Sequence, residues 1–282
     1  MRILIIIYLA LSGINLISCS PKDNPSTISS RPLLKAHAHN DYLHKNPLFD
    51  ALKNGFTSVE ADVHLVQGNL YVAHEAEEII EDFTLKAVYL DPLYEIIEKN
   101  KGYVYNQDIP LILFIDIKTD ADSTYTALKK LFEEYSEIIT QYKDNEIIGR
   151  AIVVIISGNR PKELLKKSQF RYAGYDGRLE DLGSNHTNLM IPIISENWKK
   201  YFTWDGKVEM SAAESKKLNN IINQVHNENR KIRFWATDVD SASDQQKIWK
   251  KLLDAGVDLI NTDKLVEFRN YLIHYENRIN KK

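Results

Sequence analysis

Short apolar runs alternate with amphipathic segments from Leu33 to the end of the chain, and this alternation constrains the fold most. The apolar runs have the length of buried strands, whereas the segments between them have the period of surface helices. The predicted strands are Leu33–Ala38, Thr57–Val63, Leu70–Ala73, Leu111–Ile117, Ile152–Ile156, Leu189–Ile194, Ile232–Ala236 and Leu259–Asn261. Strands that alternate with helices form a parallel sheet. Over this length they favour an α/β fold with a single closed TIM (β/α)8 barrel, with irregular strands, over an open doubly wound sheet.

Helix boundary signals agree with this order of elements. Three residue pairs are typical of helix starts: Asp91 with Pro92, which opens Leu93–Lys99, Ser211 with Glu214, and Ser243 with Gln246. Gly256 follows the predicted helix Ile248–Leu253 as a stop.

Two partner classes are disfavoured by the sequence. A dinucleotide-binding fold needs a glycine-rich turn after its first strand, and the turn here is His39-Asn40-Asp41-Tyr42. A net charge of −3 without a basic block argues against nucleic acid. One domain is the simplest count, and we expect a monomer.

The N-terminus has the pattern of a secretory signal. Arg2 precedes an apolar run from Ile3 to Leu16, which is shorter than the roughly 20 residues that a membrane-spanning helix needs. Leu16-Ile17-Ser18-Cys19 resembles a lipobox, so Cys19, the single cysteine, is predicted to be diacylated. This interpretation predicts an exported, membrane-anchored lipoprotein on the periplasmic or cell-surface side. An uncleaved anchor is the alternative.

The same interpretation divides the chain into three parts. Residues 1–18 are a signal peptide, residues 19–31 a Ser- and Pro-rich lipidated tether, and residues 32–282 the barrel. With Cys19 lipidated, the mature protein has no thiol for a disulfide or a thiolate metal site. Its stability must come from a packed core.

Acidic residues gather near the predicted strand ends, where TIM barrels carry their chemistry. Glu60 and Asp62 share one face of the second strand, and Asp116 lies near the end of a later one. Each alone could be a solvated strand end, but an unpaired charge between apolar neighbours is costly. Three neighbouring carboxylates repel one another unless a cation lies among them, and hard cations prefer oxygen ligands. The sequence therefore predicts a Mg²⁺ or Ca²⁺ site.

Histidines cluster in the same region of the sequence. Five of the eight are His37, His39, His44, His64 and His74. His37 and His39 share one face of the first strand end, and His74 follows the third predicted strand. Two histidines beside a metal can act as general acid and base, each contributing about 10²–10⁴ in rate. We assign His44 and His64 no catalytic role.

With these residues the chain resembles the superfamily of glycerophosphodiester phosphodiesterases, phosphatidylinositol-specific phospholipases C and sphingomyelinase D-like enzymes. The shared plan is a histidine after strand one, Glu-x-Asp on strand two, a second histidine shortly after, and an acidic residue at the end of the next long strand. The matching positions here are His37 or His39, Glu60 with Asp62, His74, and Asp116 with Lys118. The segments 37–42, 175–178 and 194–198 are most similar to the branch named for altered inheritance of mitochondria.

The resemblance implies a metal-dependent phosphoric diester hydrolase, with one departure. Glycerophosphodiesterases carry His-Arg-Gly after strand one, and that phosphate-binding arginine is absent here. His39-Asn40 is similar instead to the His-Asn of eukaryotic phosphoinositide phospholipases, in which the asparagine helps to hold the metal. Asn40 is therefore a fourth candidate ligand. His39 is favoured as the catalytic histidine, with His37 as the alternative.

The predicted function is hydrolysis of a phospholipid head group or a glycerophosphodiester-type substrate. His39 and His74 exchange protons with the substrate, and Lys118 adds positive charge at the phosphate. Water and an internal hydroxyl stay open as nucleophiles.

Two other functions are considered. An amidohydrolase-type metallohydrolase needs further histidines on the middle strands, where His186 alone occurs between residues 151 and 225. A lipid-anchored, non-catalytic binder of a phosphorylated ligand would not need to keep both histidine positions and all three carboxylates.

Overall fold

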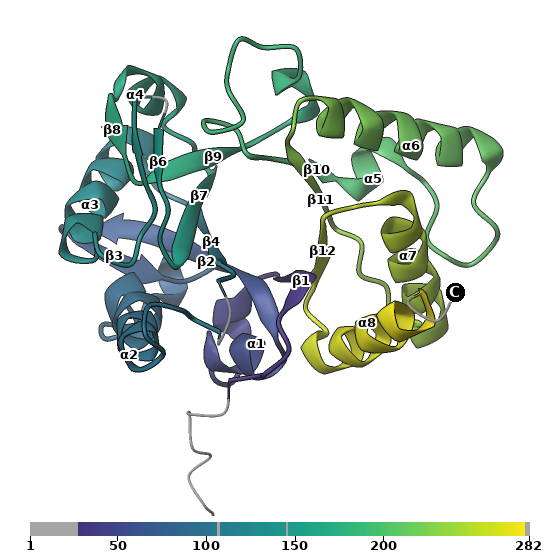
Figure 1. The fold of residues 1–282 in the computed structure, drawn as a ribbon, viewed down its shortest axis with the longest axis horizontal. Coiled ribbons are helices and arrows are strands. Elements are labelled where there is room, and N and C mark those ends of the chain that lie inside the picture. Colours follow the sequence, from purple (N-terminus) through teal and green to yellow (C-terminus); the bar gives the residue numbers. More distant parts are fainter. Residues whose placement is uncertain (1–27, 106–107, 145, 280–282) are drawn as a thin grey trace, which may run out of the picture.

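The computed structural model describes residues 28–105, 108–144 and 146–279. Its main sheet has nine strands in the order β1-β12-β11-β10-β9-β7-β4-β2-β3, and β1 also pairs with β2, which closes a barrel (Figure 1). Every pairing in this sheet is parallel except that of β2 with β3. Helices ring the outside of the barrel (Figure 1). The prediction of a single TIM barrel is confirmed.

The barrel strands are β1 (Leu33–Ala38), β2 (Phe56–Val66), β4 (Leu111–Ile117), β7 (Ile152–Gly158), β9 (Ala173–Gly177), β10 (Ile193–Asn197), β11 (Lys231–Trp235) and β12 (Leu259–Thr262). The helices are α1 (Phe49–Lys53), α2 (Asp91–Lys99), α3 (Ala121–Glu134), α4 (Lys162–Lys167), α5 (Trp198–Tyr201), α6 (Ala212–Asn227), α7 (Ala242–Ala255) and α8 (Leu265–Ile279). A small antiparallel sheet outside the barrel contains β5 (Gln141–Lys143), β6 (Glu146–Ile148) and β8 (Phe170–Arg171).

The third predicted strand forms, but it is not part of the barrel. The segment near Leu70–Ala73 forms β3 (Asn69–Val72), which pairs antiparallel with the extended end of β2 and is not a barrel strand. The cause is the tight turn Gln67-Gly68, whose two residues have φ of 51° and 85° and so fold the chain back as a hairpin.

The strand β9 (Ala173–Gly177) was missed because its sequence has no apolar run. Two of its five residues are glycines, and an added Cβ on Gly177 would lie 2.4 Å from the Ile191 side chain. Close packing, and not hydrophobicity, therefore selects this strand. The next strand is also shifted, from the predicted Leu189–Ile194 to Ile193–Asn197.

Helix ends follow their local signals in part. Ser211 caps α6 by accepting from the backbone N–H of Glu214, and Gly256 ends α7 with φ of 92°, as predicted. The cap of α7 is Ser241, however, and not Ser243. Asp91 is not a cap either, because a π-helical segment, η3 (Lys86–Leu90), runs directly into α2.

The predicted signal peptide, the lipobox and Cys19 lie outside the described residues. Within the described ranges, no helix is long and apolar enough to cross a bilayer. Ser29 and Arg31, in the predicted tether, contact the outer helices α1 and α8: the Ser29 N–H donates to the Leu52 carbonyl, and Arg31 pairs with Glu276 at 2.7 Å. The folded contacts thus begin a few residues before the predicted boundary.

Asp41 anchors the turn that carries His39 and Asn40. It lies in the short 3-10 helix η1 (Asp41–Leu43), and its buried carboxylate accepts the backbone N–H of Leu48 at 2.6 Å and the Tyr89 hydroxyl at 2.9 Å. Burial raises the pKa of Asp41 to about 7, although both hydrogen bonds oppose the rise. The turn is therefore held through a group that titrates near neutral pH.

We predict that Asp41→Asn removes part of the pH dependence of stability. The pKa of Asp41 is about 7 in the folded protein and about 3.9 in the unfolded chain, so the folded chain binds more protons between these values. The stability from Asp41 is therefore present below about pH 4 and is lost as the pH rises through about 7, a change on the order of 4 kcal/mol.

Asparagine can accept both hydrogen bonds without titrating. The free energy of urea unfolding of the variant, relative to the wild type, should therefore rise between about pH 4 and about pH 7. Asp122→Asn, at an exposed position of α3, is the control. A difference that does not vary with pH would contradict the prediction.

Candidate active site

Three carboxylates converge at the carboxyl ends of neighbouring strands. Glu60 and Asp62 extend from β2, and Asp116, opposite Asp62 in the register, extends from β4. One oxygen of each lies within 4.8 Å of the others, and within the described ranges no other group of three or more His, Cys, Asp or Glu residues converges in this way. An all-oxygen set fits Mg²⁺ or Ca²⁺, and no histidine belongs to it. The residues expected to hold a hard cation are thus brought together.

Lys118 lies between two of these carboxylates. Its Nζ is 3.0 Å from Oδ2 of Asp62 and 3.1 Å from Oδ1 of Asp116. Burial, reinforced by the negative charges of Glu60 and Asp62, raises the pKa of Asp116 to about 6, and Lys118 opposes the rise. Burial also disfavours the charged form of Lys118, but Asp116 and Asp62 outweigh it and raise its pKa. The carboxylates therefore already have a cationic partner from the chain itself.

His74 lies at the edge of this cluster. Its Nδ1 is 3.0 Å from Oδ2 of Asp62, and its side chain is 49% exposed. The Tyr42 hydroxyl donates to the same Asp62 oxygen at 2.6 Å and lies 3.1 Å from Nδ1 of His74. Tyr42 also reaches Oδ1 of Asn40 at 3.3 Å, so Asn40 joins the cluster through Tyr42. Asn40 has a left-handed backbone conformation, with φ of 45°, which turns the chain sharply after β1.

His39 is oriented by an acidic residue that sequence reasoning did not select. Its Nδ1 is 2.8 Å from Oδ1 of Asp263, just after β12, and its side chain is 26% exposed. Burial disfavours the imidazolium, but the hydrogen bond to Asp263 and the charges of Glu60 and Asp263 outweigh burial and raise the pKa of His39. Because Asp263 engages Nδ1, Nε2 is left to exchange a proton with a bound molecule.

His37 is in a different environment, although it is only two residues away. Its side chain is fully buried, with Nδ1 2.7 Å from the Ser58 hydroxyl and Nε2 2.9 Å from Oε2 of Glu60. Burial and the neighbouring Arg233 lower the pKa of His37 to about 4. Both ring nitrogens are occupied inside the protein. His37 is thus a neutral interior group, whereas His39 faces the open end of the barrel.

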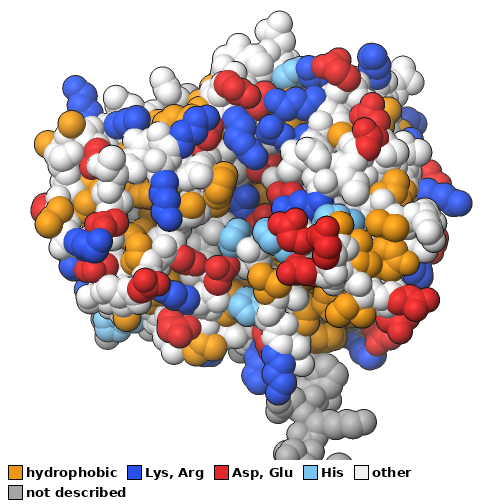
Figure 2. Space-filling view, turned by 180° about the vertical axis from the view of Figure 1, so that it is seen from behind, with side chains coloured by type: hydrophobic (Ala, Val, Ile, Leu, Met, Phe, Trp, Pro, Cys, Tyr) orange, Lys and Arg blue, Asp and Glu red, His pale blue; other side chains and the backbone are white. Residues whose placement is uncertain are grey.

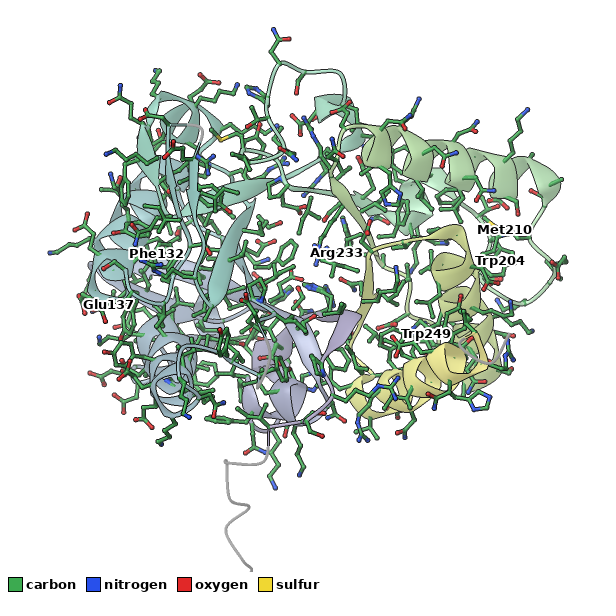
Figure 3. All side chains as sticks on the ribbon, in the orientation of Figure 1. Phe132, Glu137, Trp204, Met210, Arg233 and Trp249 are labelled. Atoms are coloured by element: carbon green, nitrogen blue, oxygen red, sulfur yellow. The ribbon has the colours of Figure 1, made fainter. Side chains whose placement is uncertain are left out.

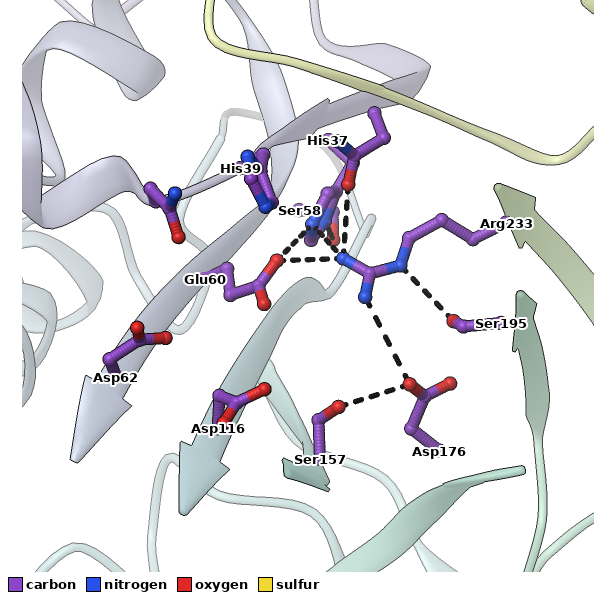
Figure 4. A network of polar contacts seen from close by, with 12 residues as sticks. His37, His39, Ser58, Glu60, Asp62, Asp116, Ser157, Asp176, Ser195 and Arg233 are labelled. Carbon is purple, nitrogen blue, oxygen red and sulfur yellow. Dashed lines mark hydrogen bonds and ion pairs between the residues drawn. The ribbon is translucent and has the colours of Figure 1, made fainter. Parts of the chain in front are cut away.

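Arg233, on β11, was missed from the sequence. Figure 3 shows it pointing into the centre of the barrel, and Figure 4 shows its contacts with Glu60, His37, Ser195 and Asp176. Only 3% of the residue is exposed. A charged residue between Ile232 and Phe234 is unusual in a buried strand. This pattern is the sequence feature that could have identified Arg233 as a site residue.

An open cleft adjoins the carboxylate cluster. It has a volume of about 470 Å³ and is lined by Thr119, Asp120, Ala121, Gly158, Asn159, Arg160 and Lys162. Gly158 connects it to the cluster, because a Cβ at this position would lie 2.2 Å from Oδ1 of Asp116. Figure 2 shows histidine, acidic and basic side chains gathered near the middle of one face of the molecule.

The chain is similar to a family of known proteins. The family model of the AIM6-like phosphodiesterase domain matches its residues 30–176. The chain is 28% identical over 292 residues to altered inheritance of mitochondria protein 6 of Eremothecium gossypii, covering 92% of this chain and 75% of that protein. Identity to the Saccharomyces cerevisiae protein of the same name is also 28%, over 296 residues, covering 88% of this chain and 73% of that protein.

A solved structure supports the fold. The glycerophosphoryl diester phosphodiesterase of Parabacteroides distasonis matches with a TM-score of 0.51 and 10% identity, covering 89% of this chain and 90% of that chain. At this identity the likeness concerns the fold alone.

The prediction of an exported, membrane-anchored lipoprotein is wrong. The relatives are altered inheritance of mitochondria proteins from Eremothecium gossypii and Saccharomyces cerevisiae, whose names refer to mitochondrial inheritance and not to export. A short apolar run after a single arginine is too general a pattern to identify a compartment.

We predict that Gly158→Ala disrupts the carboxylate cluster. The residue has φ of 64°, and the new Cβ would lie 2.2 Å from Oδ1 of Asp116 and 2.6 Å from the Ile117 carbonyl oxygen. Positive φ alone costs about 1–2 kcal/mol for alanine. We expect lower stability and an affinity for Mg²⁺ at least about tenfold weaker by calorimetric titration, because the Asp116 carboxylate must move.

Gly68→Ala is the matched control. Gly68 has φ of 85° but no atom within 4 Å of the added Cβ, so the variant has a comparable backbone cost without the clash. Equal Mg²⁺ affinities in the two variants would show that Gly158 is not needed to place Asp116.

Proposed function

Since this chain belongs to the family of AIM6-like phosphodiesterase domains, we propose that it is a metal-dependent phosphoric diester hydrolase with two-histidine acid/base catalysis. The observation that carries the proposal is the convergence of Glu60, Asp62 and Asp116 oxygens within 4.8 Å, next to two histidines that carboxylates orient. A carboxylate cluster with a purely structural role would need no accessible histidine beside it. Acid/base catalysis on a bound diester requires one.

The three carboxylates would hold the cation, with Asn40 as a further oxygen donor near them. A bound Mg²⁺ or Ca²⁺ would supply Lewis-acid stabilisation of the negative charge that grows on the phosphate. The fit rests on the donor set, since oxygen ligands on short side chains are those that these ions select.

The remaining steps belong to side chains of the protein. His39, with Nδ1 bound to Asp263, presents Nε2 to remove a proton from the attacking hydroxyl or water. His74, with Nδ1 on Asp62, presents its other nitrogen to protonate the leaving oxygen, and the two histidines can also act in the reverse order. Lys118 adds positive charge next to the phosphate. His37 takes no part in proton transfer, because both of its nitrogens are engaged in the interior.

We propose a phospholipid head group or a glycerophosphodiester as the substrate class. Support comes from the family match and from the open cleft beside Asp116, which leaves room for the alcohol part of a diester. The turn after β1 has asparagine where glycerophosphodiesterases have the phosphate-binding arginine, so the cations available to the phosphate come from other strands.

We predict that His39→Gln and His74→Gln each lower kcat/KM for bis-p-nitrophenyl phosphate by about 10²–10⁴. Mg²⁺ affinity, measured by calorimetric titration, should change little in His39→Gln, because His39 hydrogen-bonds to Asp263 and not to a carboxylate of the cluster. In His74→Gln, which loses the hydrogen bond to Asp62, affinity should fall by much less than kcat/KM. EDTA should abolish wild-type turnover, and added Mg²⁺ or Ca²⁺ should restore it.

His226→Gln is the matched control. His226 forms a comparable pair with Asp258, at 2.8 Å, but lies on α6 outside the cluster, so its loss should leave turnover unchanged. Tight metal binding without turnover on any phosphodiester would replace the proposal with a non-catalytic binder of a phosphorylated ligand.

A further inference from the structure

Arg233 connects the inner walls of the barrel through a single guanidinium. Its Nη1 donates to Oε2 of Glu60 at 2.7 Å and to Oδ1 of Asn261 at 3.2 Å, and its Nε donates to the Ser195 hydroxyl at 3.1 Å. Its Nη2 is 3.9 Å from Oδ2 of Asp176. The guanidinium also lies over the Phe114 ring, 4.6 Å from its centroid. Strands β2, β4, β9, β10 and β12 are therefore all in contact with one side chain.

The contact with His37 constrains Glu60 from the other side. Nη1 of Arg233 is 2.5 Å from Nε2 of His37, and Nδ1 of His37 is 2.7 Å from the Ser58 hydroxyl. An arginine N–H can only donate and a carboxylate oxygen can only accept, so Nε2 of a neutral ring hydrogen-bonds to Arg233 in one tautomer and to Oε2 of Glu60 in the other. His37 and Arg233 thus enclose Oε2 of Glu60, both within 3 Å of it.

This arrangement determines which part of Glu60 can bind a cation. Oε2 is held in the interior by Arg233, which leaves Oε1 to bind a cation. Rotation of the carboxylate would break the contact between Oε2 and Arg233. Lysine could supply the same charge, but it lacks the planar fork that reaches Glu60, Ser195 and Asn261 together.

We propose that Arg233 is a positioning residue for the cation site, which holds Glu60 in the orientation that lets it act as a ligand. This inference rests on the proposed function, because it needs the cation site at Glu60, Asp62 and Asp116. It goes beyond that function in assigning a task to a residue that is too buried to contact the substrate.

Arg171 provides a matched control. It is similarly buried and lies over the Tyr142 ring, 4.2 Å from its centroid. Its guanidinium donates to the carbonyl oxygens of Ala173 and Leu189, and to no carboxylate among the described residues. Arg171→Lys therefore perturbs a buried arginine without touching the cluster.

The test is calorimetric titration of Mg²⁺ into the wild type, Arg233→Lys, Arg171→Lys and Glu60→Gln at a temperature at which all are folded. Arg233→Lys keeps the charge and removes the fork, so we expect its affinity to fall about tenfold or more, as for other groups that orient metal ligands. Arg171→Lys should bind as the wild type does. Ser195→Ala, a smaller change that removes the partner of Nε, should weaken binding by a few fold, about threefold.

The outcomes separate this inference from the proposed function. Unchanged affinity in Arg233→Lys, or in Ser195→Ala if Arg233→Lys does not fold, overturns the positioning role alone when Glu60→Gln still abolishes binding. Failure of the wild type to bind Mg²⁺ or Ca²⁺ overturns the cation site and the inference together. Weaker binding in Arg233→Lys with no diesterase activity in the wild type supports the inference and counts against the catalytic proposal.

Discussion

The ion pair between Arg233 and Glu60 is the interaction around which the barrel interior is arranged. Both side chains are almost fully buried. Transferring a charged group from water to the protein interior costs on the order of several kcal/mol per ion. The pair repays this penalty only with good geometry and extra hydrogen bonds, which Ser195, Asn261 and His37 supply. Burial raises the cost of the Glu60 charge, but Arg233 outweighs it and keeps the pKa of Glu60 well below its usual range.

The same electrostatics explains why two neighbouring histidines differ. His37 points to the positive guanidinium and loses water, so it stays neutral. His39 lies beyond the end of β1, where the Asp263 carboxylate on the other side of the barrel closure holds its Nδ1. One ring is therefore enclosed in the interior beside Glu60, and the other is partly exposed at the end of the barrel. Their order in the sequence does not reveal this difference in environment.

The family relationship and the site geometry support each other at different levels. The match over residues 30–176 covers β1 to β7 and most of β9, and hence the three carboxylates, His39 and His74. Arg233 and Asp263 lie beyond it, on the last two barrel strands or just after them. Closure of β1 against β12 brings these later residues to the site, so a complete site requires the closed barrel.

The sequence by itself determined the barrel and the first half of the site. Periodic apolar runs specify strands and helices locally, and alternation along β2 places Glu60 and Asp62 on one face. It could not identify β9, whose glycines are selected by close packing, or β3, which a tight turn folds back. Nor could it pair Arg233 with Glu60 or Asp263 with His39, because these partners are separated by 173 and 224 residues. Only closure of the barrel decides which distant side chains share one desolvated interior.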